Sequence, residues 1–133
     1  MMIRLLKTLG EFRREDGNVT VESALWVPFF VLLLTLMADA ALVFYGQARA
    51  LQIAQDGNRA YSTGQLASTG ATEEFIEHEL DALSPNAVAQ TTTYRGLITT
   101  VVTVPTSDLA AVGIFTALAS VDMQVVAQMV QEN

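Results

Sequence analysis

The sequence predicts an α+β protein in which a long N-terminal helix packs on a small antiparallel β-sheet head. Three observations lead to this fold class. Residues 24–45 form an apolar segment that is broken only by Pro28, Thr35 and Asp39. The residues after Pro85 are rich in β-branched side chains, which favour strands. Residues 121–130 alternate between apolar and polar with a period of two, and this is typical of a half-buried strand.

The first helix is expected to begin near residue 18 and to continue to residue 62. At about 1.5 Å per residue, the apolar segment 24–45 spans roughly 33 Å, which is long enough to cross a bilayer core. Asp39 lies near the far end of this segment, where the cost of a charge in a membrane is smaller. Beyond it, apolar residues continue in two helical stripes, so the outer half of the helix should pack on the head: Phe44, Ala48 and Leu51 in one, and Ala50, Ala54, Gly57 and Tyr61 in the other.

Residues 63–133 are expected to form one small α+β head. A breaker cluster at residues 64–70 ends the first helix, and Thr72 is the expected N-cap of a helix over residues 73–83. The head should then contain three strands and a short apolar helix: strands over residues 88–95, 97–104 and 121–130, with the helix over residues 109–119 capped by Ser107 or Asp108. Arg95-Gly96 provides a tight turn between the first two strands.

Charge and composition narrow the function classes. The chain has 133 residues, a net charge of −7, one His and no Cys. Such a chain repels nucleic acid, and no basic patch with interleaved aromatic residues offsets this. No nucleophile motif or phosphate-binding loop is present, so we predict no enzyme activity and no cofactor. Glu74 and Asp81 flank His78 at helical spacing, but this set is typical of a solvated surface, so no metal site is predicted.

The distribution of basic residues predicts the orientation in the membrane. Four basic residues precede the apolar segment and only two follow within reach: Arg4, Lys7, Arg13 and Arg14, then Arg49 and Arg59. The N-terminus should therefore stay in the cytoplasm and the head should be exported. A conventional signal peptide cleaved after Ala40 is the competing interpretation, because a basic start, an apolar core and Ala38-Asp39-Ala40 also fit it. Its long and acidic first region disfavours that interpretation.

A charged stretch ending in Gly17 runs directly into Asn18, Glu22 and the apolar segment. This junction resembles the processing site of a type IV pilin precursor. The resemblance implies that a prepilin peptidase cuts between Gly17 and Asn18, leaving residues 1–17 as a leader. It also implies that Glu22, the fifth residue of the mature chain, pairs during assembly with the terminal amine of another subunit. The other interpretation open for Glu22 is a carboxylate at the headgroup level in the first helical turn.

A second resemblance concerns one branch of that superfamily, the TadE-like minor pilins of tight-adherence (Tad) systems. These proteins carry an acid late in the span, then an aromatic residue, then an Ala-Leu-x-x-Ala-x-x-Gly-x-Arg-like stretch. The matching residues here are Asp39, Phe44 or Tyr45, Ala50-Leu51, Ala54, Gly57 and Arg59, within a similarity over about residues 12–62. Asp39 itself could pair with a cation of another subunit inside the membrane or remain a hydrated carboxylate at the interface, and the sequence leaves both open.

The TadE resemblance implies a pilin-like fold and a function in assembly of a Tad-type pilus for surface adherence. Residues 18–62 would be the transmembrane and assembly helix in the bacterial inner membrane, with the head outside the cytoplasm or in an extracellular pilus. The implied partners are a prepilin peptidase, other major and minor pilins, the pilus assembly platform and membrane lipid. Two alternatives need no pilus: a single-pass membrane-anchored binding domain, and a secreted protein with a cleaved signal peptide.

Overall fold

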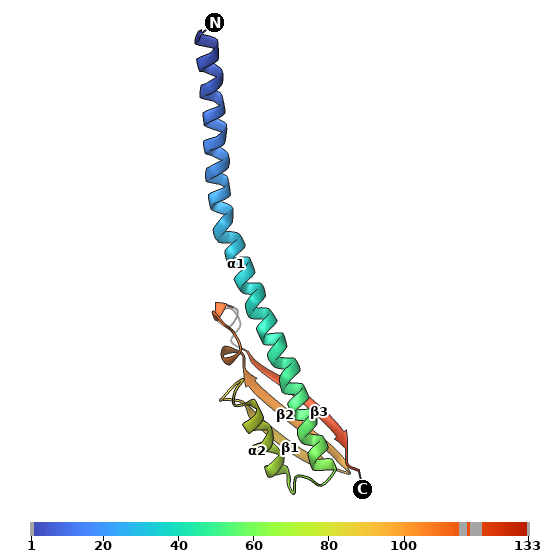
Figure 1. The fold of residues 1–133 in the computed structure, drawn as a ribbon. Helices are drawn as coiled ribbons and strands as arrows, with labels where there is room; N and C mark the ends of the chain where they lie inside the picture. The colour runs from blue at the N-terminus through green and yellow to red at the C-terminus, as the bar shows by residue number, and fades with distance from the viewer. Residues whose placement is uncertain (1, 115–116, 118–120, 133) are drawn as a thin grey trace. The chain divides into compact units, whose positions relative to one another are not determined.

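The structure is a computed structural model that describes residues 2–114, 117 and 121–132, with side chains described from Gly17 onward. It confirms the α+β class (Figure 1). The elements in chain order are α1 (Met2–Ser62), α2 (Thr69–Leu80), β1 (Val88–Tyr94), β2 (Leu97–Pro105), the 3₁₀ turn η1 (Thr106–Asp108) and β3 (Asp122–Val130). The chain divides into two compact units, Met1–Leu36 and Met37–Asn133.

In the first unit α1 is continuous from Met2 and passes through Pro28. The expected start near residue 18 was wrong, because residues 2–17 contain good helix formers such as Leu, Lys, Glu and Arg and no proline. The large apolar side chains between Val19 and Leu34 are all exposed within this unit. Trp26, Phe29 and Phe30 contact one another, with the first two ring centroids 5.5 Å apart. The helix therefore presents apolar and aromatic surface to its surroundings.

In the second unit a three-stranded antiparallel sheet has the strand order β1-β2-β3. Tyr94 pairs with Leu97 around the Arg95-Gly96 turn. Both turn residues have positive φ, 51° and 77°, as a type I′ hairpin turn requires. The expected hairpin and third strand are confirmed to within one residue at each boundary.

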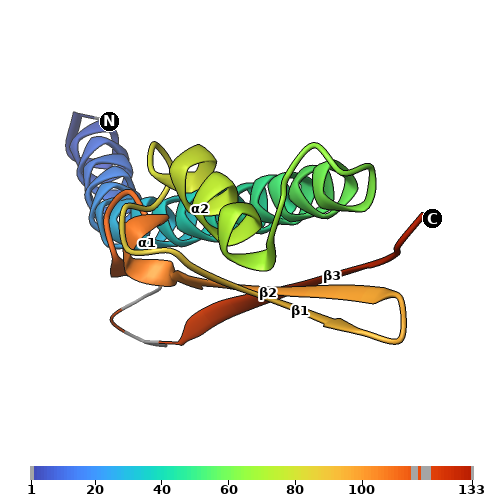
Figure 2. The same cartoon turned by 90° about the horizontal axis from the view of Figure 1, so that it is seen from below.

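The outer half of α1 and α2 lie side by side on one face of the sheet (Figure 2). Buried residues of all these elements form a single hydrophobic core: Ala50, Ile53 and Ala54 from α1, Ile76 and Leu80 from α2, and Ala89, Val102, Val104, Val125 and Ala127 from the strands. The expected packing of α1 on the head is thus confirmed for the stripe that contains Ala50, Ala54 and Gly57. Phe44 and Ala48, from the other expected stripe, are exposed instead.

A polar cluster lies inside this core, on the face of the sheet that α1 covers. Asn58 is fully buried, and its Nδ2 donates to the carbonyl oxygen of Ala127 at 3.1 Å. Thr100 donates its hydroxyl to Asn58 Oδ1 and shares a 2.8 Å hydrogen bond with the hydroxyl of Thr91. Because every polar side chain of the cluster has a partner, its burial is tolerated, and the bonds link α1 to all three strands.

The first boundary of α2 differs from the expectation. The N-cap is Ser68, whose side chain accepts a hydrogen bond from Ala71 N, and the helix runs from Thr69 to Leu80 rather than over residues 73–83. Thr72, the expected cap, is fully buried in the first turn and donates its hydroxyl to Ser68 O. Both residues can cap a helix, and the tertiary packing of Thr72 selects the earlier one.

The expected helix over residues 109–119 is wrong for residues 109–113, which follow η1 as irregular backbone. Helical backbone is found at residues 114 and 117, and the rest of the expected helix lies outside the described residues. Gly113 has a φ of 76°, which is incompatible with a right-handed helix. Asp39 also accepts hydrogen bonds from backbone N–H groups in this segment, as described below.

Candidate functional site

Gly17 and Asn18, the residues of the predicted cleavage site, lie within α1 and are exposed. A Cβ built on Gly17 would have no atom within 4 Å. Packing therefore does not require glycine at this position. A glycine inside a helix costs about 1 kcal/mol relative to alanine, so this part of α1 is easier to unwind than its flanks.

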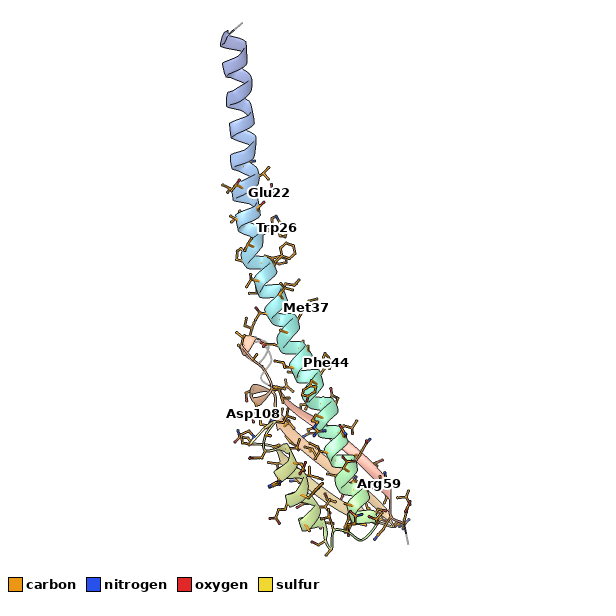
Figure 3. All side chains as sticks on the ribbon, viewed as in Figure 1. Glu22, Trp26, Met37, Phe44, Arg59 and Asp108 are labelled. Atoms are coloured by element: carbon orange, nitrogen blue, oxygen red, sulfur yellow. The ribbon has the colours of Figure 1, made fainter. Side chains whose placement is uncertain are left out.

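Glu22 projects from the exposed surface of α1, one turn before the aromatic group that begins at Trp26 (Figure 3). No ion pair joins it to any side chain that the structure describes. Its carboxylate is thus available to an external cation. Within a membrane, an unpaired carboxylate at this position would cost free energy unless a cation or water were close to it.

Asp39 is fully buried although it belongs to the apolar segment of α1. Its Oδ1 accepts hydrogen bonds from Ala111 N at 3.2 Å and Val112 N at 3.1 Å, and its Oδ2 accepts one from Ile114 N at 3.1 Å. The sequence had suggested a cation of another subunit or water as its partner. The structure supplies backbone N–H groups of the same chain, which together compensate the desolvation of the carboxylate.

The segment that Asp39 binds is held to the head by further contacts. Leu109 packs against α1 at Gly46, where a Cβ would come within 2.6 Å of a Leu109 methyl carbon. Asp108 Oδ2 accepts hydrogen bonds from the Ser84 hydroxyl and from Asn86 Nδ2, and Thr106 donates to Val121 O at 2.7 Å. Glycine at position 46 is therefore required for the close approach of this segment.

The small residues of the Ala-Leu-x-x-Ala-x-x-Gly-x-Arg-like stretch lie on the contact surface of α1 with the head. Ala50 and Ala54 are fully buried. A Cβ at Gly57 would lie 2.7 Å from Ile76 Cγ1 of α2. Small residues at these positions allow α2 and the sheet to approach α1 closely, so Gly57 serves helix contact rather than flexibility. Arg59, the last residue of the stretch, is exposed.

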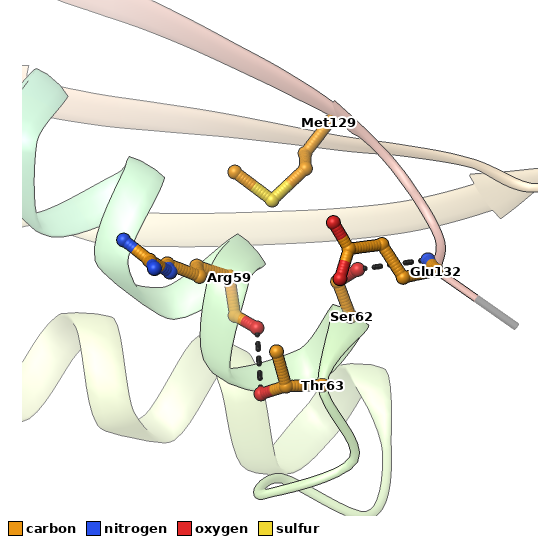
Figure 4. A pocket seen from close by; sticks show the side chains of 5 residues that line it. All are labelled: Arg59, Ser62, Thr63, Met129 and Glu132. Carbon is orange, nitrogen blue, oxygen red and sulfur yellow. Dashed lines mark hydrogen bonds between the residues drawn. The ribbon is translucent and has the colours of Figure 1, made fainter.

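Arg59 borders a shallow pocket at the end of α1, together with Ser62, Thr63, Met129 and Glu132 (Figure 4). Ser62 Oγ accepts from Glu132 N at 3.0 Å, and Thr63 Oγ1 donates to Arg59 O at 3.0 Å. Figure 4 shows the guanidinium of Arg59 directed away from Glu132. These hydrogen bonds satisfy polar groups at the C-terminal end of α1. Among the described residues that line this pocket, they do not form a catalytic pair of a nucleophile and a base.

His78, the single histidine, lies on the exposed side of α2 with its Nδ1 4.0 Å from Glu79 Oε1. Within the described part of the chain, no group of three or more His, Asp or Glu side chains could hold a metal ion. The same part of the chain contains one helix long and apolar enough to cross a membrane, Gly17–Ser62 in α1.

The comparisons with known proteins bear on the same stretch of α1. Residues 17–59 match the family model of TadE-like proteins. The search of curated proteins and the search of solved structures gave no match. The matched region begins at Gly17, includes Glu22 and Asp39, and ends at Arg59. It confirms the resemblance seen in the residues: this chain carries a TadE-like segment over residues 17–59 and is similar to a structural, pilus-associated family.

Proposed function

We propose that this protein is a minor pilin or pseudopilin that takes part in assembly of a Tad-type pilus for surface adherence. The observation that carries the proposal is that the TadE-like match begins at Gly17, the residue at which the charged stretch meets the apolar segment. A prepilin peptidase would cut between Gly17 and Asn18 at the cytoplasmic face of the inner membrane. The mature chain would then join other pilins through the assembly platform, with its head outside the cytoplasm.

In assembly, Glu22 would fix the register of one subunit against the next rather than add binding affinity. Its carboxylate is exposed on α1 and has no cationic partner among the described side chains. In a filament the terminal amine of Asn18 on a neighbouring subunit would supply that partner. A buried ion pair adds little net stability, but a subunit in the wrong register would leave the carboxylate unpaired at a cost of about 3 to 5 kcal/mol.

The contact at Asp39 supports cleavage at Gly17 over a signal-peptide cut after Ala40. A cut after Ala40 would remove Asp39 from the head. The N–H groups of Ala111, Val112 and Ile114 would then lose their acceptor. These hydrogen bonds are part-buried, so their loss would lower the stability of the shortened head.

The N-terminal residue and the intact mass of the protein from its native host test this proposal. A chain that starts at Asn18 is expected. Gly17→Leu should block processing, whereas Gly10→Leu, a matched change in the leader, should leave it intact. A chain that starts at Ala41 would identify a secreted protein, and an uncut chain would identify a plain membrane-anchored binding domain.

Glu22→Ala separates processing from assembly. This variant should be cleaved normally yet give few or no fibres by electron microscopy, because the register-setting carboxylate is missing. Ser23→Ala, the neighbouring change, should give normal fibres. Wild-type fibre numbers from Glu22→Ala would contradict the assembly role even if cleavage at Gly17 holds.

A further inference from the structure

An uncharged segment of the head, residues 109–114, is attached to α1 at the level of the apolar segment. Val112 N lies 3.1 Å from Asp39 Oδ1, and Leu109 packs at Gly46, two turns further along the helix. Residues 109–114 consist of Leu, Ala, Val, Gly and Ile. Residues 109–114 are far from α1 in the sequence. They are nevertheless held beside Asp39, which lies inside the apolar segment 24–45.

This attachment removes the charge of Asp39 from the surface of α1. Asp39 has no exposed surface, because its carboxylate faces the N–H groups of Ala111, Val112 and Ile114. The one acid in residues 24–45 is thus enclosed by its own chain. Among the described residues of α1, those exposed between Met37 and Phe44 are apolar, and the nearest charged residue after Asp39 along the helix is Arg49.

Several large apolar side chains at this level are exposed in the second unit. We define them as the apolar collar: Met37, Leu42, Phe44, Tyr45 and Val112. Phe44 is 69% exposed and Val112 is 64% exposed. Figure 3 shows Met37 and Phe44 along α1. A helix inside a bilayer contacts lipid on all sides. The residues of the apolar collar can therefore all contact lipid if they lie at the same depth, even though they do not lie on one face of the helix. Tyr45, with an apolar ring and a polar hydroxyl, suits the outer boundary of the hydrocarbon core.

The position along α1 fits a lipid partner. The apolar segment 24–45 is roughly as long as the hydrocarbon core of a bilayer, and Asp39 precedes its end by about 9 Å at 1.5 Å per residue. Residues 109–114, bound at Asp39, would accordingly lie in the outer leaflet. In the sequence, Asp39 is the one charged residue between Glu22 and Arg49.

We propose that residues 109–114 and the apolar collar form a second membrane contact of the head, that the occupant of this surface is bilayer lipid, and that Asp39 is the positioning residue that holds it in place. The inference rests on the membrane anchoring in the proposed function. Before assembly the head would be seated on the membrane by this contact in addition to α1. Asp39 satisfies the N–H groups of Ala111, Val112 and Ile114, and Thr106 O satisfies those of Leu109 and Ala110, which lowers the cost of placing this backbone at membrane depth.

The chain contains no Cys, so single-cysteine variants of the full chain can report membrane depth. Val112→Cys carries the test label, and Val130→Cys is the matched control, because Val130 is 70% exposed at the far end of β3. Leu32→Cys reports the membrane span itself. Each variant is labelled with a nitrobenzoxadiazole fluorophore and reconstituted in phosphatidylcholine and phosphatidylglycerol vesicles. Quenching by spin-labelled phospholipid and by aqueous iodide is then compared.

The label at position 112 should be quenched by spin-labelled lipid at least threefold more than the label at position 130, and at least threefold less by iodide. Equal quenching at positions 112 and 130, with lipid quenching at position 32, would overturn this inference and leave the anchor in place. Protection of position 112 from both quenchers would mean that it is covered by protein, either its own head or a second copy of the chain, and would also overturn this inference. Absence of lipid quenching at position 32 would overturn the membrane anchoring as well.

Two substitutions test the role of Asp39. Asp39→Asn replaces one acceptor oxygen by an amide donor opposite backbone N–H groups, and Gly46→Val displaces Leu109 without touching Asp39. Both should reduce lipid quenching at position 112 towards the value at position 130, while the label at position 130 keeps its emission. Asp56→Asn, an exposed acid on the same helix, should change nothing. Unchanged quenching in both test variants would contradict the positioning role.

Discussion

At the scale of single residues, close contacts along the outer half of α1 determine how the head packs. At Gly57, the side chain of Ile76 in α2 occupies the space that a Cβ would need. At Gly46, the side chain of Leu109 does the same. Both glycines are buried within the helix. The contacts, rather than a need for flexibility, explain why glycine is present despite its low helix propensity.

Gly57→Val should destabilise the head by about 2 kcal/mol, because the added side chain must displace the fully buried Ile76. The measurement is the free energy of opening from hydrogen exchange of β2 amides, with the full chain in detergent micelles. Gly70→Val is the control, since a Cβ there would have its nearest atom, Ser68 Oγ, at 3.9 Å. Equal stability of the two variants would refute the role of this contact.

At the scale of elements, α2 covers the free edge of β1. Glu73 accepts a hydrogen bond from Thr91 N at 2.6 Å, and Glu77 accepts one from Ala89 N at 2.9 Å. These N–H groups lie on the side of β1 that has no neighbouring strand. An open sheet edge is a site of unwanted strand pairing, so the two carboxylates protect the edge as well as fixing α2. The acidic residues of α2 thus differ in role, although they are close together in the sequence.

Glu73→Ala should therefore reduce the stability of the head by about 1 to 2 kcal/mol, since Thr91 N loses a charged acceptor in a partly buried position. Glu74→Ala, the adjacent and exposed acid, should change it by less than about 0.5 kcal/mol. Hydrogen exchange at Thr91 measures the effect directly. Equal protection of Thr91 in both variants would show that the carboxylate contributes nothing to the edge.

At the scale of the whole molecule, charge is distributed unevenly along the chain. Four of its seven basic residues lie in residues 1–17, and the net charge of the full chain is −7. Basic residues resist transfer across the membrane, whereas acidic residues affect orientation little. This asymmetry predicts a cytoplasmic N-terminus and an exported, acidic head.

Membrane-impermeant maleimide applied to intact spheroplasts tests that orientation. Tyr94→Cys should be labelled, because Tyr94 is 70% exposed at the hairpin end of the head. Thr8→Cys, tested in the uncleaved Gly17→Leu background, should be labelled only after the membrane is opened. The opposite pattern would mean that the head remains in the cytoplasm, and that result would exclude a function in an external pilus.

The sequence by itself determined the features that depend on neighbouring residues. The period of two in residues 121–130, the Arg95-Gly96 turn and the breakers after residue 62 each act within a few residues, so β3, the hairpin and the end of α1 were predicted to within one residue. The TadE-like segment was likewise recognisable from its residues and their spacing.

Only the tertiary structure decided which distant residues meet. Asp39 and Ala111 are 72 residues apart, and Asn58 and Thr100 are 42 apart. No local pattern reports such pairs, because the energy of a buried carboxylate or amide depends on donors and acceptors that folding brings together. For the same reason the helix expected over residues 109–113 gave way to irregular backbone. There the hydrogen bonds to Asp39 and the positive φ of Gly113 outweigh local helix propensity.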